Sequence, residues 1–229
     1  MDEKENKNIN KKKFGEKVKS FFKKFWFLLW KDNTIKGWLF SLIFLFIFIK
    51  FIFFPVLDLA TGTALPLAIV ESCSMYHQGN VFSNFNDWYL RHESKYNPLG
   101  INEDEFKTFV LKNGFSKGDI LFLIGANPDK LKVGDIIAFK SGTGGTPVIH
   151  RIMSITEENG EKVFRTMGDN NAQSLTPGNN GFGVDETDIK ANQIVGKAAF
   201  RIVPGLGWMK LIFFEASKSP SERGFCAEN

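Results

Sequence analysis

The sequence has few of the residues that proteins use to hold metals and cofactors. Its 229 residues include only two cysteines and three histidines. These form no CxxC pair and no cluster with ligand spacing, so no zinc site is predicted. The chain also lacks the GxxxxGK[ST] loop that cradles phosphates and the GxGxxG fingerprint of dinucleotide-binding proteins. We therefore expect no cofactor and no metal.

Most of the chain also lacks an excess of positive charge. The formal net charge is +4, but residues 1–36 alone carry eleven lysines against five acidic residues, so the remainder is slightly negative. A lysine-rich tail is typical of proteins that bind nucleic acid or a membrane surface. The apolar segment that follows favours the membrane, and no nucleic-acid partner is expected.

That segment, WLFSLIFLFIFIKFIFFPVL, runs from Trp38 to Leu57 with one charged residue, Lys50. A helix of this length spans roughly 30 Å, the thickness of the hydrocarbon core of a bilayer. Since the segment has no polar face, we predict one transmembrane helix over residues 37–58. A cleaved signal peptide is the alternative, because the small residues LATGTA follow, although the apolar run is long and begins late. The basic flank predicts a single-pass cell-membrane protein with a cytoplasmic N-terminus and an extracytoplasmic remainder.

Within the basic tail, apolar residues recur at helical spacing. Phe14, Val18, Phe21, Phe25 and Leu28 follow one another at intervals of four, three, four and three, with lysines between them. This pattern predicts an amphipathic helix on the inner leaflet, its lysines attracted to anionic headgroups of the lipid bilayer. A helix that binds a protein partner is the alternative.

The outer portion has a different pattern. Short apolar runs bounded by Gly and Asp predict strands with short connections: DILFLIGA, DIIAFKS, TPVIHRIMSIT, KVFRTMGD and QIVGKAAFRIVP. The segments NDWYLRHESKYN and NEDEFKTFVLKNG predict two surface helices, the second ending at Gly114. We expect a mainly-β domain over residues 59–217 with a helical insertion near 85–114, followed by a C-terminal tail, 218–229. Both cysteines, Cys73 and Cys226, would lie outside, where a disulfide is permitted but not established by the sequence.

Ser74, in the segment ESCSMYHQGN, is a candidate nucleophile close behind the membrane segment. A serine hydroxyl needs a base to attack an amide, and histidine suits this role best. His77 is close in sequence, and His92 belongs to the expected insertion, where a surface position is favoured. His150 lies inside an apolar strand, where a polar side chain is costly to bury without a partner. Asp169 follows the next strand in a Gly-Asp-Asn turn, and by itself suits turn formation better than catalysis.

The order of the motifs resembles that of the type I signal peptidases, in their archaeal and endoplasmic-reticulum form. The motifs are the membrane anchor, Ser-Cys-Ser-Met, the strands that begin with Gly-Asp, the His-Arg strand and Gly-Asp-Asn. The resemblance covers roughly residues 37–215 and implies a largely β-sheet catalytic domain with a hydrophobic surface that meets the bilayer. It implies that Ser74 is the nucleophile and His150 the general base. Ser72 would help to bind the oxyanion with the backbone N–H of Ser74, and Asp169 matches the acid of the Gly-Asp-Asn motif.

The sequence departs from the family at two points. Cys73 replaces the usual glycine between the serines, so a Cys73–His150 protease is an alternative. The family also has a second acid, often the one beside the histidine, a few residues after Gly-Asp-Asn. Here the stretch AQSLTPGNNGFGV precedes Asp185 and Asp188. We expect Asp169 or Asp185 to orient His150, with Asp169 ranked first.

The expected function is that of a membrane-bound serine endopeptidase that removes signal peptides from exported precursors. Its partners would be those precursors and the lipid bilayer, while the sequence does not indicate accessory subunits. A self-cleaving repressor of the LexA type would share the fold but needs a soluble, DNA-binding chain. A non-enzymatic membrane-anchored β-domain, acting as a sensor or an assembly subunit, is the alternative of another class. A short distance between Ser74 Oγ and a nitrogen of His150 would favour the enzyme.

Overall fold

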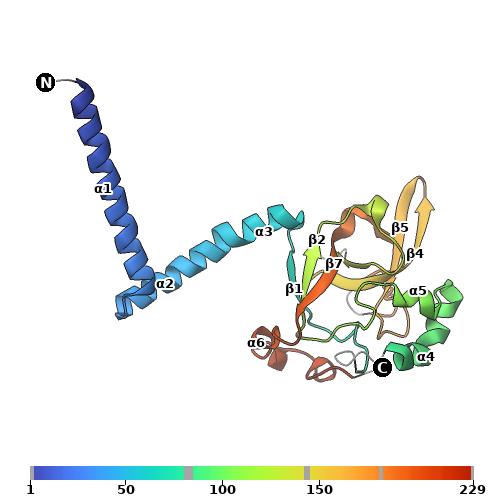
Figure 1. Cartoon of the computed structure of the whole chain (residues 1–229). Helices are drawn as coiled ribbons and strands as arrows, with labels where there is room; N and C mark the ends of the chain where they lie inside the picture. Colours follow the sequence, from blue (N-terminus) through green and yellow to red (C-terminus); the bar gives the residue numbers. More distant parts are fainter. Residues whose placement is uncertain (1–2, 80–84, 142–144, 181–182, 228–229) are drawn as a thin grey trace. The chain divides into compact units, whose positions relative to one another are not determined.

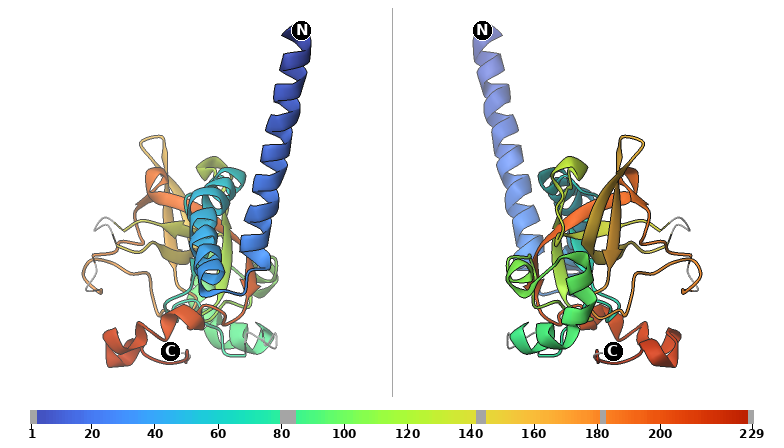
Figure 2. Two further views of the ribbon diagram at one scale, coloured as in Figure 1. Left: turned by 90° about the vertical axis from the view of Figure 1, so that its left-hand side faces the viewer. Right: turned by 90° about the vertical axis from the view of Figure 1, so that its right-hand side faces the viewer.

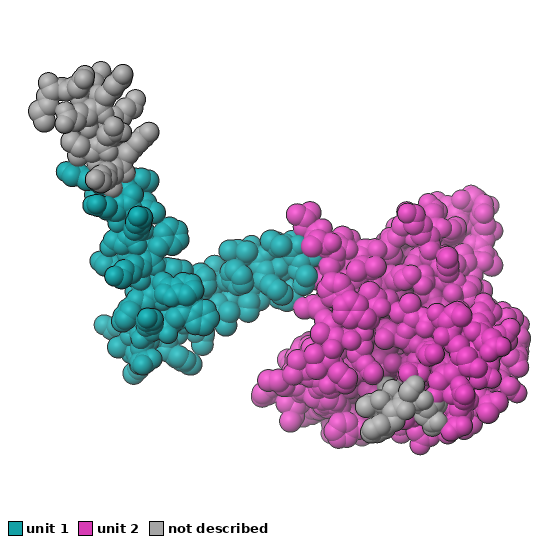
Figure 3. All heavy atoms as spheres, viewed as in Figure 1, with its two compact units in different colours: residues 1–57 teal, residues 58–229 magenta. Residues whose placement is uncertain are grey.

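The structure, a computed structural model, describes residues 3–79, 85–141, 145–180 and 183–227 (Figure 1). The chain forms two compact units, residues 1–57 and 58–229 (Figure 3). The first unit is helical and contains the basic and apolar segments. The second contains the sheet.

The apolar segment of the N-terminal unit is one helical run. It consists of α2 (Ile35–Phe48), a π-helical turn η1 (Ile49–Phe53) and α3 (Phe54–Thr61). This run, Ile35–Thr61, has a mean hydropathy of 2.6 and is long and apolar enough to cross a membrane. The helix that could span a bilayer is therefore present, and it extends beyond the predicted 37–58 at both ends. Pro55 explains the π turn: it has no N–H of its own, and the N–H of Phe54 just before it bonds to the carbonyl of Ile49, five residues back.

The basic tail forms a helix longer than the predicted amphipathic segment. Helix α1 runs from Glu3 to Trp30, and Thr34 caps the following α2 by accepting a hydrogen bond from the Gly37 N–H at 3.2 Å. The ring of Phe25 lies edge-on to Phe40 and Phe44, with centroids 5.8 and 5.2 Å away. Part of the predicted apolar face of α1 thus packs against α2 of the same unit.

The second unit is built on one antiparallel sheet of seven strands in the order β1-β2-β7-β3-β4-β5-β6 (Figure 1). The five predicted strands are all present. Strand β2 alternates buried with more exposed side chains, as half-buried strands do, whereas β3 is buried along its whole length. Two very short strands, β1 and β6, were not predicted because they carry too few residues to show a pattern. The strands are β1 (Leu67–Ile69), β2 (Ile120–Ile124), β3 (Ile136–Phe139), β4 (Val148–Glu158), β5 (Glu161–Met167), β6 (Ile189–Lys190) and β7 (Ile194–Val203).

The helical insertion packs an aromatic cluster against the sheet. It contains α4 (Phe85–Tyr96), the 3-10 turn η2 (Asn97–Leu99) and α5 (Glu103–Lys107). Fully buried rings of Trp88, Tyr96 and Phe106 contact two methionines of β4 and β5. Burial of such large rings is a major source of stability. The mainly-β fold with a helical insertion is confirmed.

The second insertion helix is shorter than predicted and ends at Lys107 instead of continuing to Gly114. Gly114 has a φ of 64°, and a Cβ there would lie 2.3 Å from the carbonyl oxygen of Met75. The next residue, Phe115, donates its N–H to that same carbonyl. A continuous helix to Gly114 is also excluded by Leu111, which has a positive φ of 53°. Gly114 instead allows the turn to approach the segment that carries Ser74.

The remaining elements lie at the two ends of the domain. The β4–β5 hairpin projects at one end, and the C-terminal elements lie at the other (Figures 1 and 2). The hairpin turn has two consecutive positive φ values, at Asn159 and Gly160, as tight two-residue turns require. The short helical elements are η3 (Pro128–Lys130), η4 (Ala191–Gln193), α6 (Trp208–Leu211), η5 (Glu215–Ser217) and η6 (Pro220–Glu222).

Candidate active site

Ser74 lies in a turn between β1 and the helical insertion, and its neighbours fix its position. The next residue, Met75, is buried and anchors the turn in the core. The carbonyl of Ser74 accepts the N–H of Asn170 at 2.7 Å, which ties the turn to the Gly-Asp-Asn segment. A Cβ on Gly168 would lie 2.6 Å from that carbonyl oxygen, so the glycine permits this approach.

His150 lies in β4, with its ring buried and directed at Ser74. Its Nε2 is 2.7 Å from Ser74 Oγ. The register of β3 and β4 places His150 opposite Ile137 in the centre of the sheet, which leaves the ring little freedom. The structure thus brings together the two residues that the sequence predicted as nucleophile and base.

Glu186 is the carboxylate beside His150, and it was not among the residues considered in the sequence. Its Oε1 is hydrogen-bonded to Nδ1 of His150 and accepts the hydroxyl of Thr166 at 2.7 Å. Its Oε2 accepts the N–H of Leu175 at 2.7 Å. Glu186 is completely buried, so these bonds hold the carboxylate in one orientation. Ser74, His150 and Glu186 form a chain of hydrogen bonds in the order of a serine-protease triad.

Ser72, two residues before the candidate nucleophile, has its hydroxyl beside that of Ser74. Its Oγ is 3.1 Å from Ser74 Oγ. The structure therefore places Ser72 within reach of the atom that would attack a substrate.

Asp169 belongs to a separate buried network and does not contact His150 through a described hydrogen bond. It accepts hydrogen bonds from Nε and Nη2 of Arg151, the latter at 2.7 Å, and from Nε2 of His77 at 2.9 Å. Burial alone would raise the pKa of Asp169, but the guanidinium of Arg151 and the bond to His77 outweigh it and hold the pKa far below its usual range. The network lies behind the turn that carries Ser74, since the Asp169 N–H is 3.3 Å from Met75 Sδ.

His77 is buried and stacked on Trp88, with ring centroids 3.4 Å apart. Burial lowers its pKa, while the bond to Asp169 opposes this shift without overcoming it. His92 is half-buried on α4, where its Nδ1 is 2.7 Å from the carbonyl of Trp88. The hydrogen bonds described for these two histidines join them to Asp169 and Trp88.

The other two candidate acids make local contacts. Asp185 accepts the N–H and the hydroxyl of Thr187 at 2.9 and 2.6 Å, the pattern of a side chain that stabilises its own turn. Asp188 is largely exposed and forms an ion pair of 2.6 Å with Lys190. The carboxylate beside His150 is thus Glu186, and neither Asp169 nor Asp185 occupies that position.

The two cysteines are joined in a disulfide, Cys73–Cys226, with Cα atoms 5.3 Å apart. The bond leaves Cys73 no thiolate, so a Cys73–His150 protease does not fit the structure. Among the described residues no group of three His, Cys, Asp or Glu side chains could hold a metal ion.

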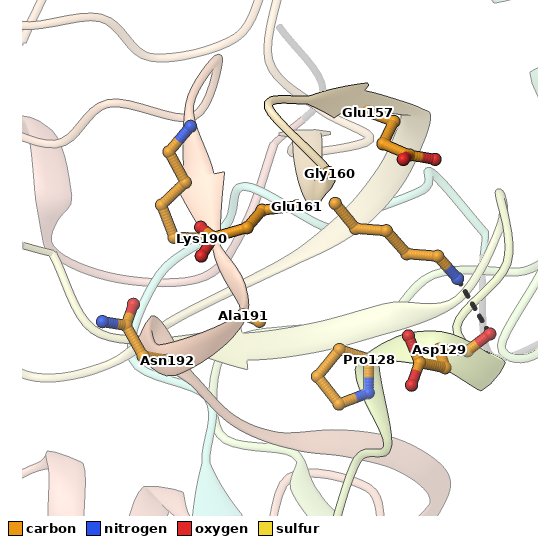
Figure 4. Close-up of a pocket in the computed structure, with 9 residues that line it drawn as sticks. Pro128, Asp129, Glu157, Gly160, Glu161, Lys190, Ala191 and Asn192 are labelled. Atoms are coloured by element: carbon orange, nitrogen blue, oxygen red, sulfur yellow. Dashed lines mark hydrogen bonds between the residues drawn. The ribbon is translucent and has the colours of Figure 1, made fainter.

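Two cavities meet at Ser74. One of about 210 Å³ is mainly apolar and is lined by Ile69, Phe115 and Pro147 together with Ser72 and Ser74. The other, of about 440 Å³, is more polar and is lined by the two serines and by the C-terminal segment. A third cavity, of about 500 Å³, lies between η3 and the β4–β5 hairpin, where Lys162 donates to the carbonyl of Asp129 (Figure 4). The described residues that line it include no serine, cysteine or histidine, so it holds no pair like Ser74 and His150.

Comparison with known proteins supports the predicted resemblance over part of the chain. The human signal peptidase complex catalytic subunit SEC11C is 37% identical over 62 residues, which cover 27% of this chain and 32% of that protein. The subunit SEC11 of Candida tropicalis is 36% identical over 62 residues, 27% of this chain and 37% of that protein. The chain thus matches about a third of the length of these curated relatives. No protein-family model matches the chain. The resemblance to signal peptidases of the endoplasmic-reticulum type is confirmed at this level.

Proposed function

We propose that this chain is a membrane-bound serine endopeptidase that removes N-terminal signal peptides from exported precursor proteins. The observation that carries the proposal is the distance of 2.7 Å between Ser74 Oγ and His150 Nε2, with Glu186 on the opposite ring nitrogen. This arrangement supplies a nucleophile, a base and an orienting carboxylate in hydrogen-bond contact. The similarity to signal peptidase catalytic subunits supports the same substrate class.

In the proposed reaction, neutral His150 accepts the proton of Ser74 as Oγ attacks the scissile carbonyl. Glu186 keeps Nδ1 protonated and stabilises the imidazolium that forms. His150 then donates the proton from Nε2 to the leaving amine, the C–N bond breaks and the mature chain is released, while the signal peptide stays bound to Ser74 Oγ as an ester. A water molecule, deprotonated by His150, hydrolyses the ester and restores Ser74.

The negative oxygen of the tetrahedral intermediate needs donors that are already in place. Ser72 Oγ, next to the nucleophile, and the backbone N–H of Ser74 are the proposed donors. In the present structure the Ser72 hydroxyl interacts with Ser74 Oγ at 3.1 Å. Its rotation toward the oxyanion would complete the site during attack.

An extended substrate would bind beside β1. In the described part of the chain β1 pairs with β2 alone, so its outer edge has backbone groups available for an added strand. The apolar cavity of about 210 Å³ adjoins β1 at Ile69 and reaches Ser74. Its small size would select small side chains on the residues before the scissile bond.

The bilayer is the second proposed partner. The helix Ile35–Thr61 would anchor the chain once, with the basic tail in the cytoplasm and the sheet domain on the opposite side. Only residues 62–73 separate the helix from Ser74, so the site would work near the membrane surface. The sheet domain also exposes apolar side chains suited to that surface, among them Phe200 and Ile202 of β7 and Met209 of α6.

The test is cleavage of a precursor that carries a signal peptide by the detergent-solubilised full chain. Ser74→Ala is expected to lower turnover by at least about 10⁴, and His150→Ala to lose most of it. His92→Ala is the matched control, since its ring bonds to the α4 backbone, and it should retain activity. Equal losses at both histidines would show that the base is misassigned.

A non-enzymatic membrane-anchored β-domain is the alternative function. It would share the anchor and the sheet but would require no contact between Ser74 and His150. Absence of cleavage by the folded wild-type chain, with several precursors, would favour this alternative.

A further inference from the structure

The C-terminal segment, residues 218–227, is attached to the turn that carries the proposed nucleophile. Cys226 forms its disulfide with Cys73, and Cys73 lies directly between Ser72 and Ser74. The bond joins residues 153 positions apart in sequence. A cysteine therefore stands where the related family usually has glycine, and it carries a covalent link.

Further bonds hold the C-terminal segment in the same place. Asn170 Nδ2 donates to the carbonyls of both Cys73 and Ala227, at 3.1 and 3.0 Å. Lys218 Nζ donates to the Glu71 carbonyl at 2.9 Å, just before the serines. The start of the segment is thus bonded to Glu71, and its end is bonded through Asn170 to Cys73.

A buried lysine strengthens this attachment. Lys117 is almost completely buried, and its Nζ donates to the carbonyl of Glu222 at 2.6 Å and pairs with the carboxylate of Glu215. A buried ammonium is costly unless it is paired and hydrogen-bonded. Here its partners are residues of the C-terminal elements, so the charge fixes those elements to the domain.

The segment forms one wall of the polar cavity beside Ser74. That cavity, of about 440 Å³, has Ser72 and Ser74 on one side and Lys218, Glu222 and Phe225 on the other. Phe225 is 86% exposed, and its ring centroid lies 5.0 Å from that of Trp208. The apolar cavity is also lined by the two serines, but its other lining residues include Ile69 of β1 and none of the C-terminal segment.

A peptide whose scissile carbonyl lies at Ser74 must extend from it in two directions. The proposed function assigns the apolar cavity and the β1 edge to the residues before the scissile bond. The polar cavity then remains for the residues after the bond. On the basis of that function, we propose that residues 218–227 form the subsite for the first residues of the released chain, and that the disulfide Cys73–Cys226 holds this subsite against the nucleophile.

The subsite suits an extended polypeptide with both polar and apolar side chains. It offers side chains of both charges, from Lys218 and Glu222, and one exposed aromatic ring. Contacts to the residues just after the scissile bond would help to position the scissile carbonyl at Ser74. Substrates that lack these residues should therefore react more slowly.

The experiment compares two peptide substrates with the same residues before the scissile bond. One carries several residues of the mature chain after it, and the other carries only a chromogenic amide. The measured quantity is kcat/KM for the longer substrate divided by kcat/KM for the chromogenic amide, with the detergent-solubilised full chain as the enzyme. We expect Cys226→Ser to lower this ratio about tenfold, because the subsite is no longer held in place. Phe225→Ala, which keeps the disulfide, should lower it about threefold.

Lys162→Ala is the matched control, since this half-buried side chain lines the third cavity, and its ratio should equal that of the wild type. The proposal would be overturned if Cys226→Ser and Phe225→Ala both left the ratio unchanged. This includes the case in which kcat/KM falls equally on both substrates. If the wild type cleaves neither peptide, the proposed function fails separately. Binding of the mature-side peptide alone to the full chain then tests the subsite, and equal affinity for wild type and Phe225→Ala would overturn it.

Discussion

Glu186 and His150 are hydrogen-bonded in the interior of the sheet domain, through Oε1 and Nδ1, although 36 positions separate them in sequence. On its other side the same imidazole contacts Ser74 Oγ. Thr166 and the N–H of Leu175 bond the two carboxylate oxygens, so Glu186 is held by the sheet and by the segment that follows it. The geometry points to Glu186 as the residue that fixes the tautomer of His150.

The first prediction is that Glu186→Gln abolishes most activity. The substitution keeps the size of the side chain but removes the charge that stabilises the imidazolium. We expect turnover of a precursor to fall by about 10⁴, as in the equivalent change of a serine-protease triad. Asp185→Asn is the matched control and should retain near-normal turnover, since Asp185 bonds only Thr187 among its described partners. Normal turnover in Glu186→Gln would contradict this assignment.

The second prediction concerns the proposed oxyanion donor. Ser72→Ala removes a hydroxyl that is exposed and 3.1 Å from Ser74 Oγ, so the fold should be unaffected. We expect kcat to fall by about 10² to 10³ with little change in KM, because the bond is made mainly in the transition state. Ser72→Thr, which keeps a hydroxyl, should recover part of the loss. An increase in KM at constant kcat would show that Ser72 binds substrate instead.

Much of the fold could be predicted from the sequence because it depends on local patterns. Apolar runs bounded by Gly and Asp predicted five strands. An apolar run without a polar face predicted the helix around Lys50. Ser74 and His150 were predicted from ordered motifs, and their contact was left to the structure. Strands β1 and β6 were missed because a strand of two or three residues carries no periodicity.

Glu186 could not be ranked because the sequence offered several acids after a stretch of uncertain alignment. One signal was present: in an extended segment alternate residues share a face. Val184 and Glu186 are both buried, whereas Asp185 between them is not. The disulfide gave no such signal, because the spacing of two distant cysteines does not determine whether they meet.

The third prediction assigns Asp169 to stability. Asp169→Asn would leave the fully buried guanidinium of Arg151 without its counter-charge. We expect the free energy of unfolding to fall by about 3–5 kcal/mol, measured by denaturant titration of the detergent-solubilised chain. Asp188→Asn, which breaks an exposed ion pair with Lys190, should cost less than about 1 kcal/mol. A variant Asp169→Asn of normal stability but without turnover would instead give Asp169 a catalytic role.

The fourth prediction concerns orientation in the membrane. Protease added to sealed, right-side-out vesicles should digest the region after residue 61 and spare the tail, because the lysines lie before the helix. Vesicles opened with detergent are the control, in which both parts become accessible. Digestion of the tail in sealed vesicles would reverse the orientation and place the candidate site on the wrong side for exported substrates.

The last prediction follows from the lowered pKa of His77. Burial disfavours its imidazolium, so the folded chain keeps the ring neutral to a lower pH than the unfolded chain does. The unfolded chain binds a proton near pH 6.5. As the pH falls below that value the unfolded state binds more protons than the folded state. The free energy of unfolding then decreases by at most about 1.4 kcal/mol per pH unit from this group.

Denaturant titrations at about pH 7.5 and about pH 5.5 should therefore show a smaller loss of unfolding free energy in His77→Gln than in the wild type. Equal losses in the wild type and His77→Gln would show that another group causes the pH dependence.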